Sequence, residues 1–187
     1  MYLFVKRIID ILSSILAIIL LLPLFLVISL SIFLQDFHNP IFSHKRIGKN
    51  GFLFSFYKIR SMPVNSPNVE SHESHKINVT PIGKFIRRSN LDELPQLFCI
   101  LKGDMSLIGP RPPIPSQKNL IQLRTLNNSI HLRPGLTGWA QVNSYDNIPD
   151  FEKASLDGYY FDNISFTLDV KILLMTISYL TKRPPKY

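Results

Sequence analysis

The sequence predicts an α/β protein of the α+β type: a small, mostly helical, membrane-associated domain with one β-hairpin and an apolar N-terminal helix. Three observations predict this class. Residues 8–34 are almost continuously apolar, an Asn-Gly pair separates two segments typical of strands (41–47 and 52–57), and residues 165–180 show an amphipathic helical pattern. A chain of 187 residues suits one domain with a sizeable core and an appendage.

The N-terminal apolar run is about 27 residues long, and roughly 20 suffice to cross a bilayer. Pro23 lies near its middle, where a proline removes a backbone donor and kinks or breaks a helix. Cations flank the run on both sides, and cationic flanks are typical of the cytoplasmic face. We therefore expect a re-entrant helix that breaks at Pro23 and returns to the same face; a kinked single-pass anchor is the alternative. The flanking cations are Lys6, Arg7, Lys45, Arg46 and Lys49.

The overall charge favours anionic partners. The net charge is +8 and the pI is near 9.7, which suits nucleic acid, a phosphorylated substrate or an acidic membrane surface. We expect no nucleic acid, because the basic residues are scattered and the sequence has no groove-reading helix or zinc signature. The single cysteine, Cys99, excludes an internal disulfide, and its apolar neighbours predict a buried core residue.

The hairpin follows the apolar run. Residues 41–47 form the first predicted strand, residues 48–51 supply the turn, and alternating phenylalanines give the second strand an aromatic face. This strand runs into Lys58 and Arg60, which places two cations at its end. In isolation these cations suit a solvated strand edge. The alternating phenylalanines are Phe52, Phe54 and Phe56.

Two adjacent carboxylates, Asp92 and Glu93, follow a short helix that begins after Thr80 and ends in a pair of arginines. Asn90 is a good N-cap residue and Glu93 resembles part of a capping box, so the acids suit the first turn of a helix that continues over 94–101. The alternative is a cleft in which arginines bind an anionic substrate and a carboxylate acts as nucleophile. The local residues leave both interpretations open.

Two loops rich in glycine and proline come next. Arg111 lies in the first, where prolines stiffen the backbone, and a rigid arginine suits phosphate recognition. In the second, glycines let backbone amides converge on an anion beside Arg133 and Thr137. The last predicted helix is amphipathic and either packs on the core or lies in the membrane interface. The predicted helices in this part of the chain cover residues 117–127, 151–160 and 165–180.

The ordered series of these motifs resembles the monotopic phosphoglycosyl transferases, also called bacterial sugar transferases. The resemblance covers nearly the full length, and a long ordered set is far more specific than a single motif. The matching pieces are Lys6-Arg7 with Asp10, the Pro23 break, and residues 46–51, 58–62, 91–97, 102–106, 109–112 and 133–142.

The resemblance implies transfer of a phosphosugar from a UDP-sugar to undecaprenyl phosphate, with release of UMP. This reaction is the first membrane step of capsule, exopolysaccharide, O-antigen or glycoprotein glycan assembly. The resemblance also implies that Asp92 is the nucleophile of a covalent phosphosugar intermediate, that Glu93 acts beside it, and that Mg²⁺ is the cofactor, with Asp92 as a metal ligand. The expected substrate-binding residues are Lys58, Arg60, Arg88, Arg111, Arg133 and Thr137.

Two parts are implied: a re-entrant membrane helix over residues 1–36 and a cytoplasmic catalytic domain over residues 37–187. The expected protein is monotopic, lies on the cytoplasmic face of a bacterial inner membrane and contacts inner-membrane lipids; a homo-oligomer is left open. A non-enzymatic, basic, membrane-anchored adaptor is the alternative function. One hydrophobic run is too few for a multi-pass sugar-phosphate transferase.

Three positions depart from the family pattern. Leu22 stands where serine often precedes the proline, and His44 stands where glutamine is frequent. Ser144-Tyr145 replaces a common glycine-arginine pair, so a phosphate-binding cation is absent or replaced there. None of the three departures touches the Asp92-Glu93 pair, and together they bear on donor choice more than on reaction type. Residues 66–69 and 123–125 look like the branch that uses N-acetylated deoxy-sugar donors, such as relatives of UDP-N-acetylfucosamine or UDP-N-acetylquinovosamine.

Overall fold

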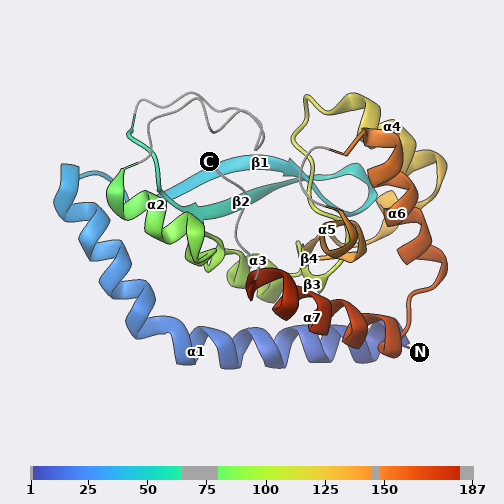
Figure 1. Cartoon of the computed structure of the whole chain (residues 1–187), viewed down its shortest axis with the longest axis horizontal. Helices are drawn as coiled ribbons and strands as arrows, with labels where there is room; N and C mark the ends of the chain where they lie inside the picture. Colours follow the sequence, from blue (N-terminus) through green and yellow to red (C-terminus); the bar gives the residue numbers. More distant parts are fainter. Residues whose placement is uncertain (1, 65–79, 145–147, 182–187) are drawn as a thin grey trace.

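The computed structural model describes residues 2–64, 80–144 and 148–181, within which the chain is mostly helical with two small sheets (Figure 1). Residues 66–69, which resemble the branch with N-acetylated deoxy-sugar donors, and Tyr145, one of the departures from the family pattern, lie outside the described residues. The elements in chain order are α1 (Tyr2–Asp36), β1 (Ile41–Ile47), the 3₁₀ turn η1 (Lys49–Gly51), β2 (Leu53–Ile59), α2 (Pro81–Arg88), the 3₁₀ turn η3 (Leu91–Glu93), α3 (Gln96–Lys102), β3 (Ser106–Ile108), α4 (Lys118–Leu126), the 3₁₀ turn η4 (Ser129–His131), β4 (Gly135–Thr137), α5 (Trp139–Asn143), α6 (Asp150–Asp162) and α7 (Phe166–Thr181).

α1 is one helix of 35 residues with Pro23 inside it. It changes direction near its middle (Figure 1), as an interior proline predicts, because the ring removes one backbone hydrogen bond and crowds the preceding turn. The predicted break is thus a bend within a continuous helix. Beyond the bend, Ile28 and Ile32 pack with Ile59 and Ile86 in a small core cluster, whereas the first half of the helix lies against α3.

The first half of α1 buries polar side chains and exposes apolar ones. Lys6, Asp10 and Ser14 follow one another at four-residue spacing and are all buried. Lys6 Nζ lies 2.9 Å from Asp169 Oδ2 in α7, and the Asp10 carboxylate accepts a 3.0 Å hydrogen bond from the backbone N–H of Leu107. The exposed positions are mainly leucine, isoleucine, valine and phenylalanine. This pattern is the reverse of that of a helix facing water.

The predicted hairpin is confirmed. β1 and β2 pair antiparallel, with Ile41 opposite Ile59 at the open end. In the connecting turn, Asn50 and Gly51 have φ angles of 57° and 80°, in the left-handed region that asparagine and glycine tolerate best. The hairpin therefore brings Lys58, near the end of β2, to a fixed place beside the core.

The main core lies between the hairpin and α3. Phe54 and Phe56 pack there with α3 residues that include Leu97 and Cys99. Cys99 is buried, as predicted. Phe52 was expected on the same aromatic face, but it precedes β2 and is 74% exposed. Phe52 directly follows the turn η1 and lies outside the strand, so two of the three phenylalanines, Phe54 and Phe56, pack in the core.

The pairing of β3 with β4 was not predicted from the sequence. The two strands are parallel, with Ser106 opposite Gly135 and Ile108 opposite Thr137. Each has three residues, which is too short for a periodic signal. A Cβ atom on Gly135 would lie 2.1 Å from the backbone nitrogen of Gly109, so only glycine permits this approach. The pair holds the two loops rich in glycine and proline side by side.

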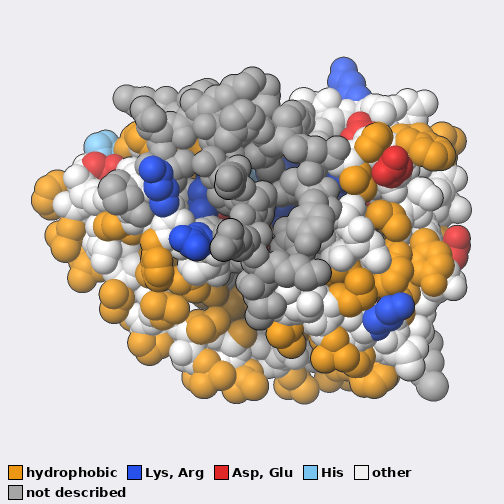
Figure 2. Space-filling model, viewed as in Figure 1, with side chains coloured by type: hydrophobic (Ala, Val, Ile, Leu, Met, Phe, Trp, Pro, Cys, Tyr) orange, Lys and Arg blue, Asp and Glu red, His pale blue; other side chains and the backbone are white. Residues whose placement is uncertain are grey.

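The three helices predicted after residue 116 correspond to α4, α6 and α7. α7 buries Ile172 and exposes Leu174 and Ile177. The start of α1 lies beside the start of α7 (Figure 1), where the Tyr2 hydroxyl donates a 2.5 Å hydrogen bond to Asp169. Figure 2 shows hydrophobic side chains gathered along the edge of the molecule that α1 and α7 form. α7 therefore packs on the core and also continues the apolar edge.

Candidate active site

The acid pair lies in the turn η3 and not in the first turn of a capped helix. Asn90 has a left-handed φ of 55° and makes no side-chain capping hydrogen bond. The Glu93 carboxylate accepts hydrogen bonds from Lys58 and Arg111 instead. α3 begins only at Gln96, beyond the acids. The capping interpretation is therefore wrong, and both carboxylates are available for other contacts.

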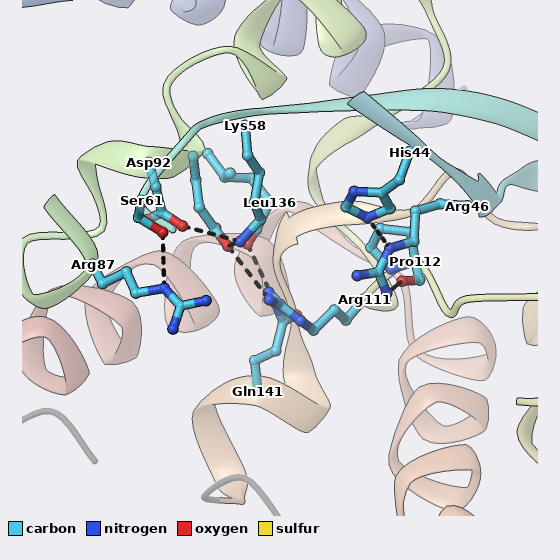
Figure 3. A network of polar contacts seen from close by, with 11 residues as sticks. His44, Arg46, Lys58, Ser61, Arg87, Asp92, Arg111, Pro112, Leu136 and Gln141 are labelled. Atoms are coloured by element: carbon cyan, nitrogen blue, oxygen red, sulfur yellow. Dashed lines mark hydrogen bonds and ion pairs between the residues drawn. The ribbon is translucent and has the colours of Figure 1, made fainter. Parts of the chain in front are cut away.

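Lys58 bridges the two carboxylates. Its Nζ lies 3.2 Å from Asp92 Oδ2 and 2.9 Å from Glu93 Oε1. Arg111 reaches the same site with Nη2, which lies 3.4 Å from Glu93 Oε1. Figure 3 shows Lys58 descending from β2 toward Asp92, with Arg87 and Arg111 directed toward the same space. Asp92 itself is buried, so its carboxylate is shielded from bulk water.

The two carboxylates have different electrostatic environments. Burial raises the pKa of Asp92 above its ordinary value, although the Lys58 ammonium acts in the opposite direction, and the neighbouring Glu93 charge raises it further. Burial acts on Glu93 in the same sense, but Lys58 and Arg111 outweigh it and lower the pKa of Glu93 to about 2. Glu93 is therefore the firmly ionised member and Asp92 the more basic one. Such divergence within an acid pair is typical of catalytic sites.

The acid pair opens into a cavity of about 580 Å³, a volume typical of ligand-binding pockets. Besides the two acids, the charged lining residues are Lys58, Arg87 and Arg111. Uncharged polar lining residues include Thr137, Gln141, Ser144 and Thr176. Much of the remaining wall is apolar and includes Leu21 of α1, Leu136 of β4 and Leu173 of α7. One cavity therefore combines anion-binding cations with an apolar wall that the N-terminal helix helps to form.

The backbone of the Arg111 loop is held at consecutive carbonyl oxygens. Prolines lack an N–H group, so this loop can be fixed mainly through its acceptors. The Pro110 carbonyl accepts from the Gly135 N–H at 2.9 Å, and the Pro113 carbonyl accepts from the Ile47 N–H at 2.9 Å. The two carbonyls between these accept from side chains. Arg124 Nη1 lies 2.8 Å from the Arg111 carbonyl, and Arg46 Nη1 lies 3.1 Å from the Pro112 carbonyl. The predicted stiff loop is thus fixed by three separate elements, β1, β4 and α4.

His44, one of the departures from the family pattern, supports this loop through Arg46. Arg46 Nε donates a 2.6 Å hydrogen bond to His44 Nε2. Burial lowers the pKa of His44 to about 4, and the positive charges of Arg46, Lys58 and Arg111 lower it in the same direction. The imidazole is therefore neutral near pH 7 and able to accept that bond (Figure 3).

Five of the residues predicted from the sequence come together around the cavity: Lys58, Asp92, Glu93, Arg111 and Thr137. Their elements are far apart in the chain, and the packing of β2, η3 and β4 with the Arg111 loop joins them. The Thr137 hydroxyl lies 2.7 Å from that of Thr176 in α7, so this side of the cavity is tied to the last helix.

Three other predicted substrate-binding residues do not line the cavity. Arg60 forms two contacts with Asp36 at the end of α1, of 2.5 and 2.7 Å. Arg133 Nε donates a 2.9 Å bond to the carbonyl of Gly103, where α3 ends. Arg88 is exposed on α2. Their role in substrate binding stays a prediction, and the structure places all three away from the acid pair, because the packing of the elements decides where each side chain points.

Arg87 replaces Arg88 in the cavity lining, which sequence reasoning missed. Arg87 Nε donates a 3.0 Å bond to the Ser61 hydroxyl (Figure 3). The helical period gives the signal: Ile86 is buried, and Arg88, two residues later, lies on the opposite side of the helix. Arg87 is nearer to the buried face. Ser144, noted above as a departure from the family pattern, also lines the cavity, whereas no sequence signal assigned a binding role to Gln141 or Thr176.

The donor set fits Mg²⁺ only together with a substrate. Among residues 2–64, 80–144 and 148–181, no group of three or more His, Cys, Asp and Glu side chains is placed to hold a metal ion. Asp92 and Glu93 do supply hard carboxylate oxygens, and Mg²⁺ commonly binds through one or two carboxylates plus substrate phosphates. The acid pair therefore fits a shared site better than an all-protein cage.

Comparison with known proteins identifies the family. A model of the bacterial sugar transferase family matches residues 1–183. The chain belongs to the bacterial sugar transferase family. A UDP-N-acetylgalactosamine-undecaprenyl-phosphate N-acetylgalactosaminephosphotransferase of Aeromonas hydrophila is 39% identical over 94% of this sugar transferase and 43% of its own length.

Two further relatives support the same assignment. An undecaprenyl-phosphate galactose phosphotransferase of Salmonella typhimurium is 34% identical over 98% of this chain and 42% of its own length. The exopolysaccharide production protein ExoY of Sinorhizobium fredii is 33% identical over 92% of this chain and 83% of its own length. This sugar transferase thus spans about two-fifths of several curated relatives, among them those of Aeromonas and Salmonella, and most of ExoY.

Proposed function

We propose that this sugar transferase is an enzyme that moves a phosphosugar from a UDP-sugar to undecaprenyl phosphate and releases UMP. The observation that carries the proposal is the acid pair, buried Asp92 and half-buried Glu93, which Lys58 bridges in a cavity that also contains Arg87, Arg111 and an apolar wall. Such a cavity suits two substrates of different character, an anionic nucleotide sugar and a lipid phosphate. The names of the relatives from Aeromonas and Salmonella support the same reaction class.

In the first step, a carboxylate oxygen of Asp92 attacks the β-phosphorus of the UDP-sugar. A carboxylate–phosphorus bond forms, the bond from the β-phosphorus to the bridging oxygen breaks, and UMP leaves with that electron pair. In the second step, a phosphate oxygen of undecaprenyl phosphate attacks the same phosphorus and the Asp92 carboxylate leaves. Covalent catalysis splits one difficult transfer into two easier steps. The raised basicity of Asp92 suits the attack, and its burial keeps water from the intermediate.

The neighbouring charges have separate tasks in this mechanism. Lys58 offsets the charge of both acids, so that an anionic donor is able to approach them. Arg111 and Arg87 bind the diphosphate, for which the planar guanidinium group is well suited. Glu93, ionised at neutral pH, holds Lys58 and Arg111 in place. Mg²⁺ bound at Asp92 and Glu93 with the donor phosphates would neutralise charge on the diphosphate.

The location we propose is the cytoplasmic face of a bacterial inner membrane, with α1 re-entrant and the protein monotopic. Within the described residues, α1 is the one helix long and apolar enough to cross a bilayer. Its first half exposes apolar side chains and buries Lys6, Asp10 and Ser14, as suits a helix in contact with lipid tails. The apolar edge along α1 and α7 (Figure 2) would face the same membrane.

The direct test is an assay of the purified protein in detergent with a panel of UDP-sugars, Mg²⁺ and undecaprenyl phosphate. The panel includes N-acetylated deoxy-sugar donors, which we propose as the substrate class. We expect UMP release with at least one donor, and mass spectrometry of enzyme trapped without the lipid should find a phosphosugar on Asp92. Asp92→Asn should lose essentially all turnover. The matched control Asp104→Asn removes a carboxylate paired with the exposed Lys102 and should remain active.

Full activity of Asp92→Asn, or turnover in a single ternary complex without the adduct, would remove Asp92 from the mechanism. An absence of UMP release with every donor, from folded protein, would overturn the proposed reaction.

A further inference from the structure

Two buried charges that the proposed mechanism does not use lie directly behind the Arg111 loop. Arg124 in α4 is 2% exposed and Asp157 in α6 is 1% exposed. Arg124 Nε and Nη2 lie 2.8 and 2.6 Å from Asp157 Oδ2. The remaining nitrogen, Nη1, donates the 2.8 Å hydrogen bond to the Arg111 carbonyl. One guanidinium thus joins α4, α6 and the backbone of a cavity residue.

Stability alone is a weak explanation for this pair. Taking two charges out of water costs about as much as their attraction returns, and apolar residues of similar size often serve as well. The packing nevertheless favours a close approach of the two helices: a Cβ atom on Gly158 would lie 2.7 Å from Asn127 Nδ2. The fold therefore brings α6 against α4 at Gly158, the residue next to Asp157. The charge pair formed there directs Arg124 Nη1 at the Arg111 carbonyl.

We propose that Arg124, held by Asp157, is a positioning residue for Arg111. It fixes the main chain at Arg111 so that the guanidinium is directed at Glu93 and at the substrate diphosphate. This inference rests on the proposed function. Arg111 has a long side chain that contacts Glu93 at 3.4 Å, and a fixed backbone reduces the freedom it loses when it binds phosphate.

The test is a double-mutant cycle between the charge pair and Arg111. Arg124→Met combined with Asp157→Leu removes both charges together, so that no charge is left buried alone. Affinity for UDP is measured by calorimetry, and kcat and KM are measured with the UDP-sugar that the enzyme turns over. We expect the combined variant to bind UDP about tenfold more weakly, with a matching rise in KM and a small change in kcat. In an Arg111→Ala background the same two substitutions should have no further effect.

A matched control separates positioning from loosening of the helices. Asn127→Ala removes another contact between the end of α4 and α6, the 2.6 Å hydrogen bond from Nδ2 to the Ala154 carbonyl, and does not touch the loop. It should lower the melting temperature and leave UDP affinity unchanged. Two outcomes in an enzyme that still turns over would overturn the positioning role. One is unchanged UDP affinity in the combined variant; the other is a loss of UDP affinity that adds to the loss caused by Arg111→Ala. Coupled losses of UDP affinity in a protein that turns over no UDP-sugar would overturn the proposed function and leave the positioning role in place.

Discussion

Arg60 and Asp36 form a two-pronged ion pair, with Nη1 2.5 Å from Oδ2 and Nη2 2.7 Å from Oδ1. Asp36 is the last residue of α1, and Arg60 follows β2 directly. The pair therefore ties the end of the bent helix to the strand that carries Lys58. Arg60, which the sequence predicts to bind substrate, therefore helps to fix the direction in which α1 ends.

This geometry predicts that substitution of Arg87 affects substrate binding, whereas substitution of Arg60 affects stability. Arg87→Met removes a cation from the cavity lining and should raise KM for the UDP-sugar about tenfold, because a charge-assisted contact to phosphate is lost. Arg60→Met should leave that KM unchanged within about twofold and should lower the melting temperature, because Asp36 loses its partner. Steady-state kinetics and thermal unfolding of both variants check the prediction. A rise in KM for Arg60→Met alone would restore Arg60 to the substrate site.

The buried pair Lys6 and Asp169 should contribute strongly to stability. Lys6→Met leaves the Asp169 carboxylate in the core without that cation, beside the hydroxyl donors of Tyr2 and of Tyr160 at 2.6 Å. Breaking a buried ion pair in this way costs about 3–5 kcal/mol. Unfolding in detergent should show that loss. Lys102→Met is the control and should change little, since the Lys102 side chain is 69% exposed. Equal stability of the two variants would contradict the role given to the Lys6 contact.

The pH dependence of turnover should report the environment of Asp92. Burial raises the pKa of Asp92, while Lys58 acts against that rise. The nucleophile must be ionised, so kcat/KM should fall as pH drops through this raised pKa. Lys58→Met removes a positive charge, the pKa of Asp92 then rises further, and the acid limb should move to higher pH. Lys58→Arg keeps the charge and should leave the limb nearly in place. A shift to lower pH in Lys58→Met would show that Lys58 does not act on Asp92 in this way.

The re-entrant topology predicts that both ends of α1 lie on the same side of the membrane. Leu3 and Gln35 are exposed near the two ends, and the native Cys99 is buried and should not react. Single variants Leu3→Cys and Gln35→Cys in spheroplasts should resist a membrane-impermeant maleimide, and both should react in inverted vesicles. Reaction of one variant in spheroplasts and of the other in inverted vesicles would establish a spanning helix.

Local chemistry made much of the fold predictable. The Asn-Gly signal identified the hairpin turn because few residues tolerate a positive φ, and it was confirmed at Asn50 and Gly51. Pro23 marked a change of direction in α1 for the same kind of local reason. The pairing of β3 with β4 was missed, because three-residue parallel strands have no periodicity and their contact joins segments far apart in the chain.

The candidate site was predictable in its residue types and less so in its members. Asp92, Glu93, Lys58 and Arg111 were all named from motifs and do converge. The motif named Arg88, whereas Arg87 lines the cavity, because adjacent helical residues point about 100° apart and the direction depends on which face of α2 is buried.

By itself, the sequence determined the family pattern, the apolar helix with its proline, and the acid pair among cations, because these depend on residue types in a fixed order. Only the tertiary structure decided which cations face the acids. Lys58 and Arg111 contact Glu93. Arg60 contacts Asp36 instead, and Arg133 contacts the end of α3. The physical reason is that charge acts over a few ångströms, and those distances exist only after the strands, turns and helices have packed.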